Sequence, residues 1–322
     1  MRWLRRFVLL LLLFVSCTTL AQPYPSRPVR VLIPFTAGSA ADIIARAMEP
    51  AMRERLGQPF VIDNRGGAGG NIAAELTAKA NPDGYTIMMA TIGTHAINYS
   101  LYSKLPFHPQ RDFSPVGLVA ESPNALVINP KVQAASIQEL IALAKSKPGG
   151  LNYGSSGSGT TVHLSAELFS VMTGIKMTHV PHKGAAEALT SLLGGQTDLM
   201  FASLSSSIPL IKAGRLRAFA VTGANRSPSI PELPTVADAA GLPGFEASAW
   251  FGIVGPAGMP KGAVTALNKA ALSALEDVEV RKRLFNAGVE IRVSSPQDFA
   301  RYIESEMQKW AKVVKESGAR VD

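Results

Sequence analysis

The fold of this chain is decided by the stretch Val29-Arg30-Val31-Leu32-Ile33-Pro34-Phe35-Thr36-Ala37-Gly38-Ser39-Ala40-Ala41-Asp42. Its first five residues are mostly β-branched and apolar, which predicts a strand over 29–33. Ser39 and Asp42 have the spacing of a capping box, so we expect a helix that begins at Ala40 and continues to Leu56. A strand, a loop of small residues and a helix in that order are typical of an α/β protein.

The same alternation of strand and helix continues along the chain. It predicts parallel-rich sheets flanked by helices, which is an α/β fold class with two lobes. We expect the first lobe to be discontinuous and to contain residues 22–124 and 236–322, with the second lobe over 125–235. The Pro- and Gly-rich segment 231–245 is interpreted as the return to the first lobe. Further strands are predicted near 60–62, 86–90, 125–128, 151–153, 177–180, 199–202, 218–222 and 249–254.

The first 21 residues have the pattern of an export signal. Three arginines within the first six residues precede the apolar run Phe7–Val15, which is shorter than the roughly 20 residues of a membrane span. We expect cleavage after Ala21 and a mature protein in the periplasm. In a competing interpretation, Cys17 is the acylated residue of a bacterial lipoprotein.

Composition narrows the class of partner. The chain has a formal charge of +8 and a single cysteine, so stability comes from buried apolar surface rather than from disulfides. Lys and Arg are scattered instead of forming the basic runs that follow a phosphate backbone. We therefore expect no nucleic-acid partner and a monomeric protein. A mild positive field suits an anionic ligand, although an ordinary basic surface explains the same charge.

Two loops have the form of ligand sites, because open parallel sheets bind ligands beyond the carboxyl ends of strands. Small residues let backbone amides approach a ligand, and the amides of a first helical turn favour negative charge. Facing loops on separate lobes would hold a small carboxylate in a cleft between the lobes. The alternative is that both loops are ordinary connectors with turn-forming residues. The candidate ligand-binding residues here are Phe35, Thr36, Ala37, Gly38, Ser39, Ala40 and Asp42 in one loop, and Ser155, Ser156, Gly157, Ser158, Thr160 and Thr161 in the other.

Three other strand ends supply further candidates. Lys183 could neutralise an anionic ligand, although a lysine in water is the ordinary alternative. Small or hydroxylated residues at the other positions would leave room for a ligand or bond to it. The further candidates are Thr91, Gly93 and Thr94, then Lys183, Gly184 and Ala185, and finally Ser203.

Catalytic and cofactor motifs are missing from the sequence. There is no G-x-S-x-G elbow and no H-E-x-x-H, and the glycine run 66–70 matches neither a P-loop nor a dinucleotide fingerprint. His179 and His182 form an H-x-x-H without an adjacent carboxylate, so we expect no metal site. His163 is interpreted as a packed or capping residue rather than a general base. We therefore expect neither an enzyme nor a cofactor.

The order of several short motifs resembles one family. They are Tyr24-Pro25-Ser26-Arg27-Pro28, Asp63-Asn64-Arg65-Gly66-Gly67, Pro82-Asp83-Gly84-Tyr85, Asn152-Tyr153-Gly154-Ser155 and Gly194-Gly195-Gln196-Thr197-Asp198. The likeness is to the Bug-type receptors, which are the extracytoplasmic solute-binding proteins of tripartite tricarboxylate transporters. It implies a two-lobed periplasmic binding protein fold (Venus flytrap) in which backbone groups of the first loop hold a ligand carboxylate. It also implies delivery of that carboxylate to integral-membrane permease subunits.

Three departures from the family pattern concern the expected pocket. Ala37-Gly38-Ser39 replaces a usual Pro-Gly-Gly, His182 replaces a usual Tyr, and Ala202-Ser203 stands where Asp-Asn is frequent. The resemblance therefore assigns no particular ligand, and the missing Asp argues against an amino acid. Two other functions stay open: a ligand-sensing partner of a signalling protein, and a periplasmic enzyme on the same scaffold.

Overall fold

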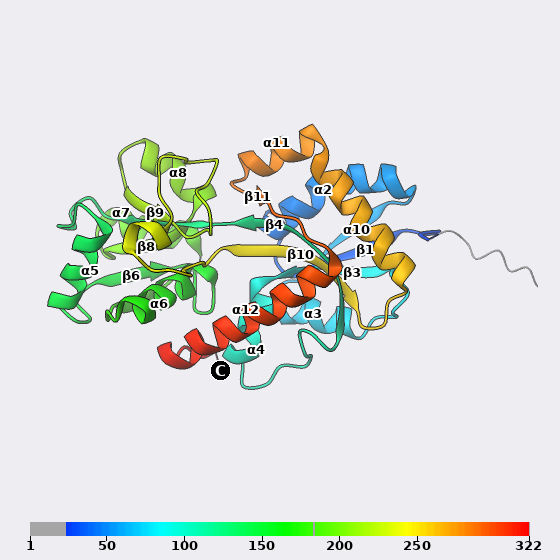
Figure 1. Ribbon diagram of the computed structural model, residues 1–322, viewed down its shortest axis with the longest axis horizontal. Coiled ribbons are helices and arrows are strands. Elements are labelled where there is room, and N and C mark those ends of the chain that lie inside the picture. The colour runs from blue at the N-terminus through cyan, green and yellow to red at the C-terminus, as the bar shows by residue number, and fades with distance from the viewer. Residues whose placement is uncertain (1–23, 183, 322) are drawn as a thin grey trace, which may run out of the picture.

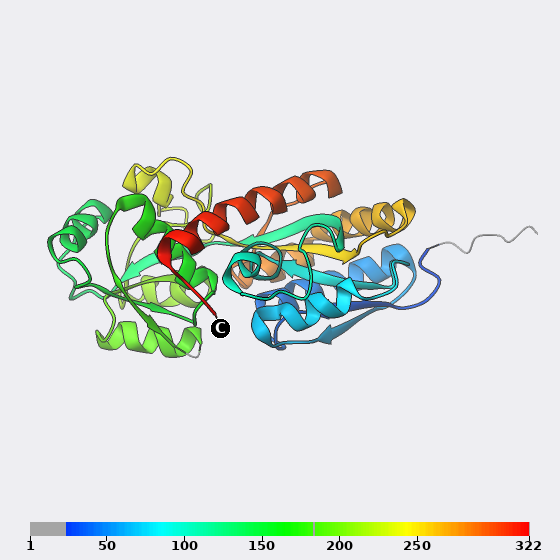
Figure 2. The same ribbon diagram turned by 90° about the horizontal axis from the view of Figure 1, so that it is seen from below.

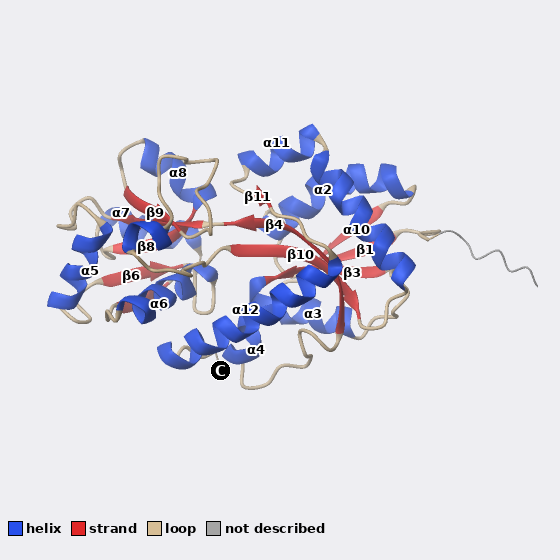
Figure 3. Ribbon diagram, viewed as in Figure 1, coloured by secondary structure: helices blue, strands red, loops and turns tan. Residues whose placement is uncertain are grey.

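The chain folds into two lobes, each built on its own β-sheet with helices on both faces (Figures 1 and 3). The structure is a computed structural model and describes residues 24–182 and 184–321. The predicted export signal, the alternative anchor Cys17 and the candidate Lys183 lie outside the described residues. Within the described residues no helix combines the length and the apolar character that a bilayer span requires.

The first sheet has six strands in the order β11-β4-β10-β3-β1-β2. β1 pairs in parallel with both β2 and β3, whereas β10 runs antiparallel to β3 and β4. The strands are β1 (Val29–Ile33), β2 (Phe60–Asn64), β3 (Thr86–Thr91), β4 (Phe113–Ser122), β10 (Ala249–Pro256) and β11 (Glu290–Ile291). The helices of this lobe are α2 (Ala40–Leu56), η1 (Ala68–Gly70), α3 (Asn71–Ala78), η2 (Gly93–Ile97), α4 (Asn98–Leu101), α10 (Lys261–Glu276), α11 (Val278–Asn286) and α12 (Pro296–Ser317).

The second sheet has five strands in the order β7-β6-β8-β5-β9. β6 is parallel to β7 and β8, so their carboxyl ends share one edge, and β5 is antiparallel to β8 and β9. The strands are β5 (Asn124–Ile128), β6 (Asn152–Ser155), β7 (Thr178–Pro181), β8 (Leu199–Ser203) and β9 (Arg217–Val221). The helices are α5 (Ile137–Ser146), α6 (Thr161–Thr173), α7 (Ala185–Gly194), α8 (Leu204–Lys212) and α9 (Val236–Ala240).

Two chain crossings and one helix join the lobes. β4 continues through Pro123 into β5, and residues 241–248 lead back into β10. α12 lies along the first lobe and reaches the second, where it packs against α6 (Figure 2). The strands β4, β5 and β10, which run antiparallel to their neighbours, therefore carry the chain between the lobes.

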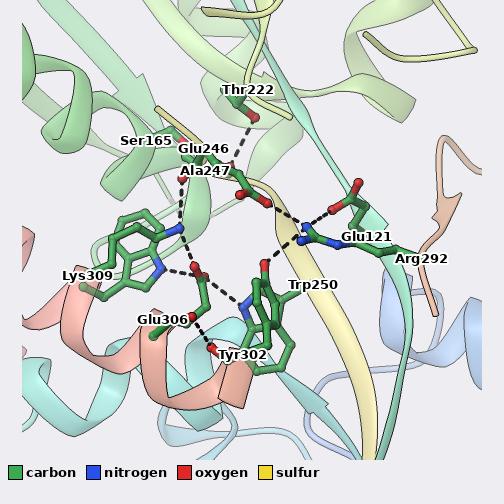
Figure 4. A network of polar contacts seen from close by, with 12 residues as sticks. Glu121, Ser165, Thr222, Glu246, Ala247, Trp250, Arg292, Tyr302, Glu306 and Lys309 are labelled. Atoms are coloured by element: carbon green, nitrogen blue, oxygen red, sulfur yellow. Dashed lines mark hydrogen bonds and ion pairs between the residues drawn. The ribbon is translucent and has the colours of Figure 1, made fainter. Parts of the chain in front are cut away.

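Partly buried and buried polar contacts tie these crossings together (Figure 4). Arg292 donates to Glu121 at the end of β4 (2.7 Å) and to Glu246 on the return crossing (2.6 Å). The carbonyl of Ala247 accepts hydrogen bonds from Ser165 and Thr222, which belong to the second lobe. Charge-assisted hydrogen bonds thus join the two crossings to each other. Neutral hydrogen bonds join the return crossing to the second lobe.

The predicted α/β class with two lobes is confirmed, and so is the predicted helix start at Ser39 and Ala40. Ser39 accepts a hydrogen bond from the Asp42 amide at the start of α2, and Ser136 accepts one from Glu139 at the start of α5. The sheets are mixed, because the crossing strands run antiparallel to their neighbours.

The contacts around residue 236 favour a later return to the first lobe than the sequence predicted. α9 packs against α5 and β9, so residues 236–240 lie beside the second sheet. Phe245 then packs against both Phe169 and Phe201, which belong to the second lobe. The exact lobe boundaries stay a prediction, and the packing favours a return close to residue 247.

Candidate functional site

A cavity of about 550 Å³ lies between the two lobes. It is bounded by loops that follow the carboxyl ends of parallel strands in both sheets, and by the crossing strands β4, β5 and β10. This is the position at which open α/β sheets bind ligands. The lining residues are Phe35, Gly38, Ala40, Ala41, Gly69, Thr91, Ile92, Gly93, Ile97, Asn98, Leu101, Tyr102, Ser122, Asn124, Ser156, Ser158, Gly159, Thr160, Thr161, Val162, Ala185, Ser203, Ser205, Ser206, Ala249, Trp250, Phe251 and Ala287.

The first lobe presents the amino-terminal end of α2 to the cavity. Ala40 and Ala41 lie in its first turn, where backbone amides have no acceptor within the helix. Asp42 does not line the cavity. Its carboxylate accepts hydrogen bonds from the Gly38 amide (2.9 Å), from Arg46 and from Asn64, and so fixes the shape of the loop.

These contacts also set the ionisation of Asp42. Burial would raise the pKa of its carboxyl, but Arg46 and the hydrogen-bond donors outweigh burial and hold the pKa below its usual range. A carboxylate that stays ionised keeps the loop in the same conformation at neutral pH.

The end of β3 adds a second wall in the first lobe. Thr91 and Gly93 line the cavity, whereas Thr94 is fully buried and bonds back to Thr91. Thr94 also contacts Nδ1 of His95, which lies edge-on against Phe113. The pair Thr94 and His95 therefore stabilises the turn that presents Thr91 and does not reach the cavity.

The second lobe contributes three helix starts. Thr160 caps α6 by accepting a hydrogen bond from the His163 amide. Thr161 and Val162, whose amides have no acceptor within the helix, line the cavity. Ala185 begins α7, and Ser205 and Ser206 lie in the first turn of α8. As far as the described residues go, neither α7 nor α8 receives a side-chain cap.

Eleven of the predicted residues line the cavity, and they come from both lobes. They are Phe35, Gly38, Ala40, Thr91, Gly93, Ser156, Ser158, Thr160, Thr161, Ala185 and Ser203. The predicted residues that lie nearby but do not line it are Thr36, Ala37, Ser39, Asp42, Thr94, Ser155, Gly157 and Gly184. Ser155 is fully buried, and its hydroxyl contacts Nε2 of His179 at 2.6 Å. Ligand contact by these residues stays a prediction.

The part of the cavity formed by the crossing strands, called its floor here, was not predicted from the sequence. Ser122, Asn124, Ala249 and Phe251 belong to the two crossings, and nothing in their local sequence marks a ligand site. Gly69 and Asn98 were also missed, although Asn98 donates to the Gly69 carbonyl and so fixes the glycine run against η2. A prediction of where the chain crosses between lobes would have found the floor, because a cleft between lobes must be bounded by its crossings.

The lining is uncharged. Among the described lining residues there is no Asp, Glu, Lys, Arg or His. Any negative charge bound there would be met by hydroxyls, amides and the positive ends of α2, α6, α7 and α8. Within the described residues, His, Cys, Asp and Glu side chains do not form a group of three that could hold a metal ion.

Acid should destabilise the fold beneath this site. Burial lowers the pKa of His95 to about 3, and burial together with His163 lowers the pKa of His179 to about 4. Between the ordinary pKa of histidine and these values, the unfolded chain binds protons that the folded chain does not, so stability is lost as the pH falls.

Urea unfolding at about pH 7 and about pH 4.5 measures this loss. We expect a His95→Asn variant, which retains an acceptor beside Thr94, to show a smaller difference between the two conditions than the unaltered chain. An equal difference would show that His95 is not a source of the acid sensitivity.

Comparison with known proteins agrees with this geometry. A family model described as the tripartite tricarboxylate transporter family receptor matches residues 44–319. The chain belongs to this receptor family. The chain is also similar to protein BugT of Bordetella pertussis. The two sequences are 34% identical over 315 residues, which cover 96% of this chain and 96% of BugT. The resemblance to Bug-type receptors is confirmed.

Solved structures of family members have the same fold. Rpa4515 of R. palustris, solved with adipate, is 42% identical with a TM-score of 0.78 and covers 92% of this chain and 98% of that protein. MatC of Rhodopseudomonas palustris, solved with bound malate, is 34% identical with a TM-score of 0.75 and covers 90% of this chain and 100% of that protein. The family thus includes receptors that hold dicarboxylates.

Proposed function

We propose that this chain is a periplasmic receptor that holds a small carboxylate in the cavity between its lobes and delivers it to a membrane permease. The observation that carries the proposal is that helices α2, α6, α7 and α8 begin at one uncharged cavity, one of them in the first lobe and three in the second. Helix amino termini on both sides would stabilise two negatively charged ends of one molecule. Family membership supports the permease as partner, and the predicted export signal supports the periplasm.

The chemistry of the lining narrows the ligand class. Leu101, Val162 and Phe251 add apolar surface to the lining. A dicarboxylate with an aliphatic or aromatic body would bury its apolar part there and place its charges at the amides. The described lining offers no carboxylate to pair with an ammonium group, so acidic amino acids should bind more weakly.

The same lining argues against an enzyme. Ser155 and His179 are paired like a nucleophile and its base, but Ser155 is fully buried and lies outside the cavity lining. The serine and threonine hydroxyls that do line it are not joined to a histidine or carboxylate in the described lining. A receptor function therefore fits the site better than turnover does.

Thermal unfolding of residues 22–322 against a panel of carboxylates tests the proposal. At a hundredfold excess over its dissociation constant, a ligand adds about 2.7 kcal/mol of stability. We expect adipate, malate or an aromatic dicarboxylate to raise the melting temperature by several degrees, glutamate to raise it less, and every compound to be recovered unchanged. Consumption of the compound, or no shift with any member of the panel, would contradict the receptor function.

A further inference from the structure

The cavity loop of the second lobe rests on a stack of three rings. His163 lies parallel to His179 with ring centroids 4.0 Å apart, and Tyr153 stacks on His179 at 4.9 Å. His163 comes from α6, His179 from β7 and Tyr153 from β6, so the stack joins three elements under one loop. Simple packing would explain the rings but not the polar contacts at their edges.

One of those contacts reaches the cavity lining. Nδ1 of His163 accepts a hydrogen bond from the Gly159 amide at 3.1 Å. Gly159 lines the cavity and lies so close to the first lobe that a Cβ at this position would come within 2.5 Å of Leu101. The His163 contact therefore fixes the loop at the point where the two lobes touch.

The opposite edge of the His163 ring faces a carboxylate. Nε2 of His163 is 3.7 Å from Glu167, which also accepts a hydrogen bond from the Tyr153 hydroxyl. An imidazole that accepts at Nδ1 carries its proton at Nε2, and a carboxylate beside Nε2 stabilises that tautomer. Burial would raise the pKa of Glu167, but His163 and Tyr153 outweigh it and keep the carboxyl ionised.

We propose that His163 is a positioning residue for ligand binding, which holds the Gly159 amide and through it the cavity loop of residues 156–161. Glu167 in turn sets the tautomer of His163. The expected effect on ligand affinity rests on the proposed function. The expected effect on hydrogen exchange of the Gly159 amide does not. If His163 only filled space under the loop, its ring would matter for ligand binding and its Nδ1 acceptor would not.

Two substitutions separate the two roles. His163→Phe keeps a flat ring in the stack and removes the acceptor, whereas His163→Asn places an amide oxygen near the Nδ1 position and removes the ring. We expect His163→Phe to weaken adipate binding by about three- to tenfold and to speed hydrogen exchange of the Gly159 amide about tenfold. We expect His163→Asn to remain within about twofold of the unaltered chain in both measurements.

Calorimetry measures the affinity of each variant for adipate, and hydrogen exchange on the unliganded protein measures the exchange rate of the Gly159 amide. His108→Phe, a change at a half-buried histidine of the first lobe, is the control and should alter neither measurement. If the unaltered chain bound no carboxylate, the proposed function would be wrong, and the Gly159 exchange rates would still decide whether His163 fixes the loop. Faster exchange in His163→Asn than in His163→Phe, or equal exchange in all three chains, would overturn the positioning role.

Discussion

Glu306→Ala should lower the free energy of unfolding by about 3 kcal/mol, because it leaves several buried donors without a partner. The Glu306 carboxylate accepts hydrogen bonds from the indole nitrogens of Trp250 and Trp310, both at 3.0 Å, and forms an ion pair with Lys309 (Figure 4). Glu306 is 3% exposed, and both indoles are fully buried.

Urea unfolding measures this effect, and α12 itself provides the matched control. Glu316 pairs with Lys312 at 4.0 Å on the exposed face of the same helix. Exposed pairs of this kind contribute little, so Glu316→Ala should change stability by less than about 0.5 kcal/mol. Similar small losses in both variants would show that the Glu306 carboxylate does not hold α12 to β10.

The elements that the sequence predicted well are those fixed by local contacts. The helix over 40–56 has the predicted bounds, since its apolar spacing and its cap act within a few residues of the chain. Ser136 likewise caps α5 through a contact within its own first turn. Helix bounds set by such local contacts can be predicted without knowledge of what the helix packs against.

The elements that were missed depend on distant partners. β4 contains Pro115 and Gly117, which resemble strand breakers, yet Pro115 pairs with Val254 at an irregularity of the ladder where a missing donor is tolerated. Thr235 caps α9 inside a segment rich in Pro and Gly, and only its packing on α5 and β9 places it in the second lobe. Neither outcome follows from residue order alone.

The candidate site divides in the same way. The strand-end loops were predicted because parallel sheets bring such loops to one edge, and residues of both loops line one cavity. The roles of Asp42 and Thr94 were not predicted, because each side chain bonds to its own loop instead of the cavity. Whether a polar side chain supports a loop or faces a ligand depends on which neighbours fold against it.

Gly288→Ala should weaken adipate binding at least tenfold, because it separates the lobes at the cavity edge. Gly288 has a φ of +65°, and a Cβ there would lie 2.8 Å from the backbone nitrogen of Ser205 in α8. Ala287 and Ser205 both line the cavity, so this contact joins the lobes at its border. The backbone of Ser205 cannot rotate away as a side chain can, and the clash is relieved only if the lobes move apart.

The comparison with Gly241 isolates that effect. Gly241 has a φ of +63°, and a Cβ there would meet nothing within 4 Å. Gly241→Ala therefore carries the same backbone strain, about 1–2 kcal/mol, without the clash. Gly288→Ala should lose at least as much stability in urea as Gly241→Ala, and only Gly288→Ala should lose adipate affinity by calorimetry and gain radius of gyration in X-ray scattering. If Gly241→Ala reduced affinity as much, strain alone would account for the loss, and lobe contact at Ser205 would have no part in holding the ligand.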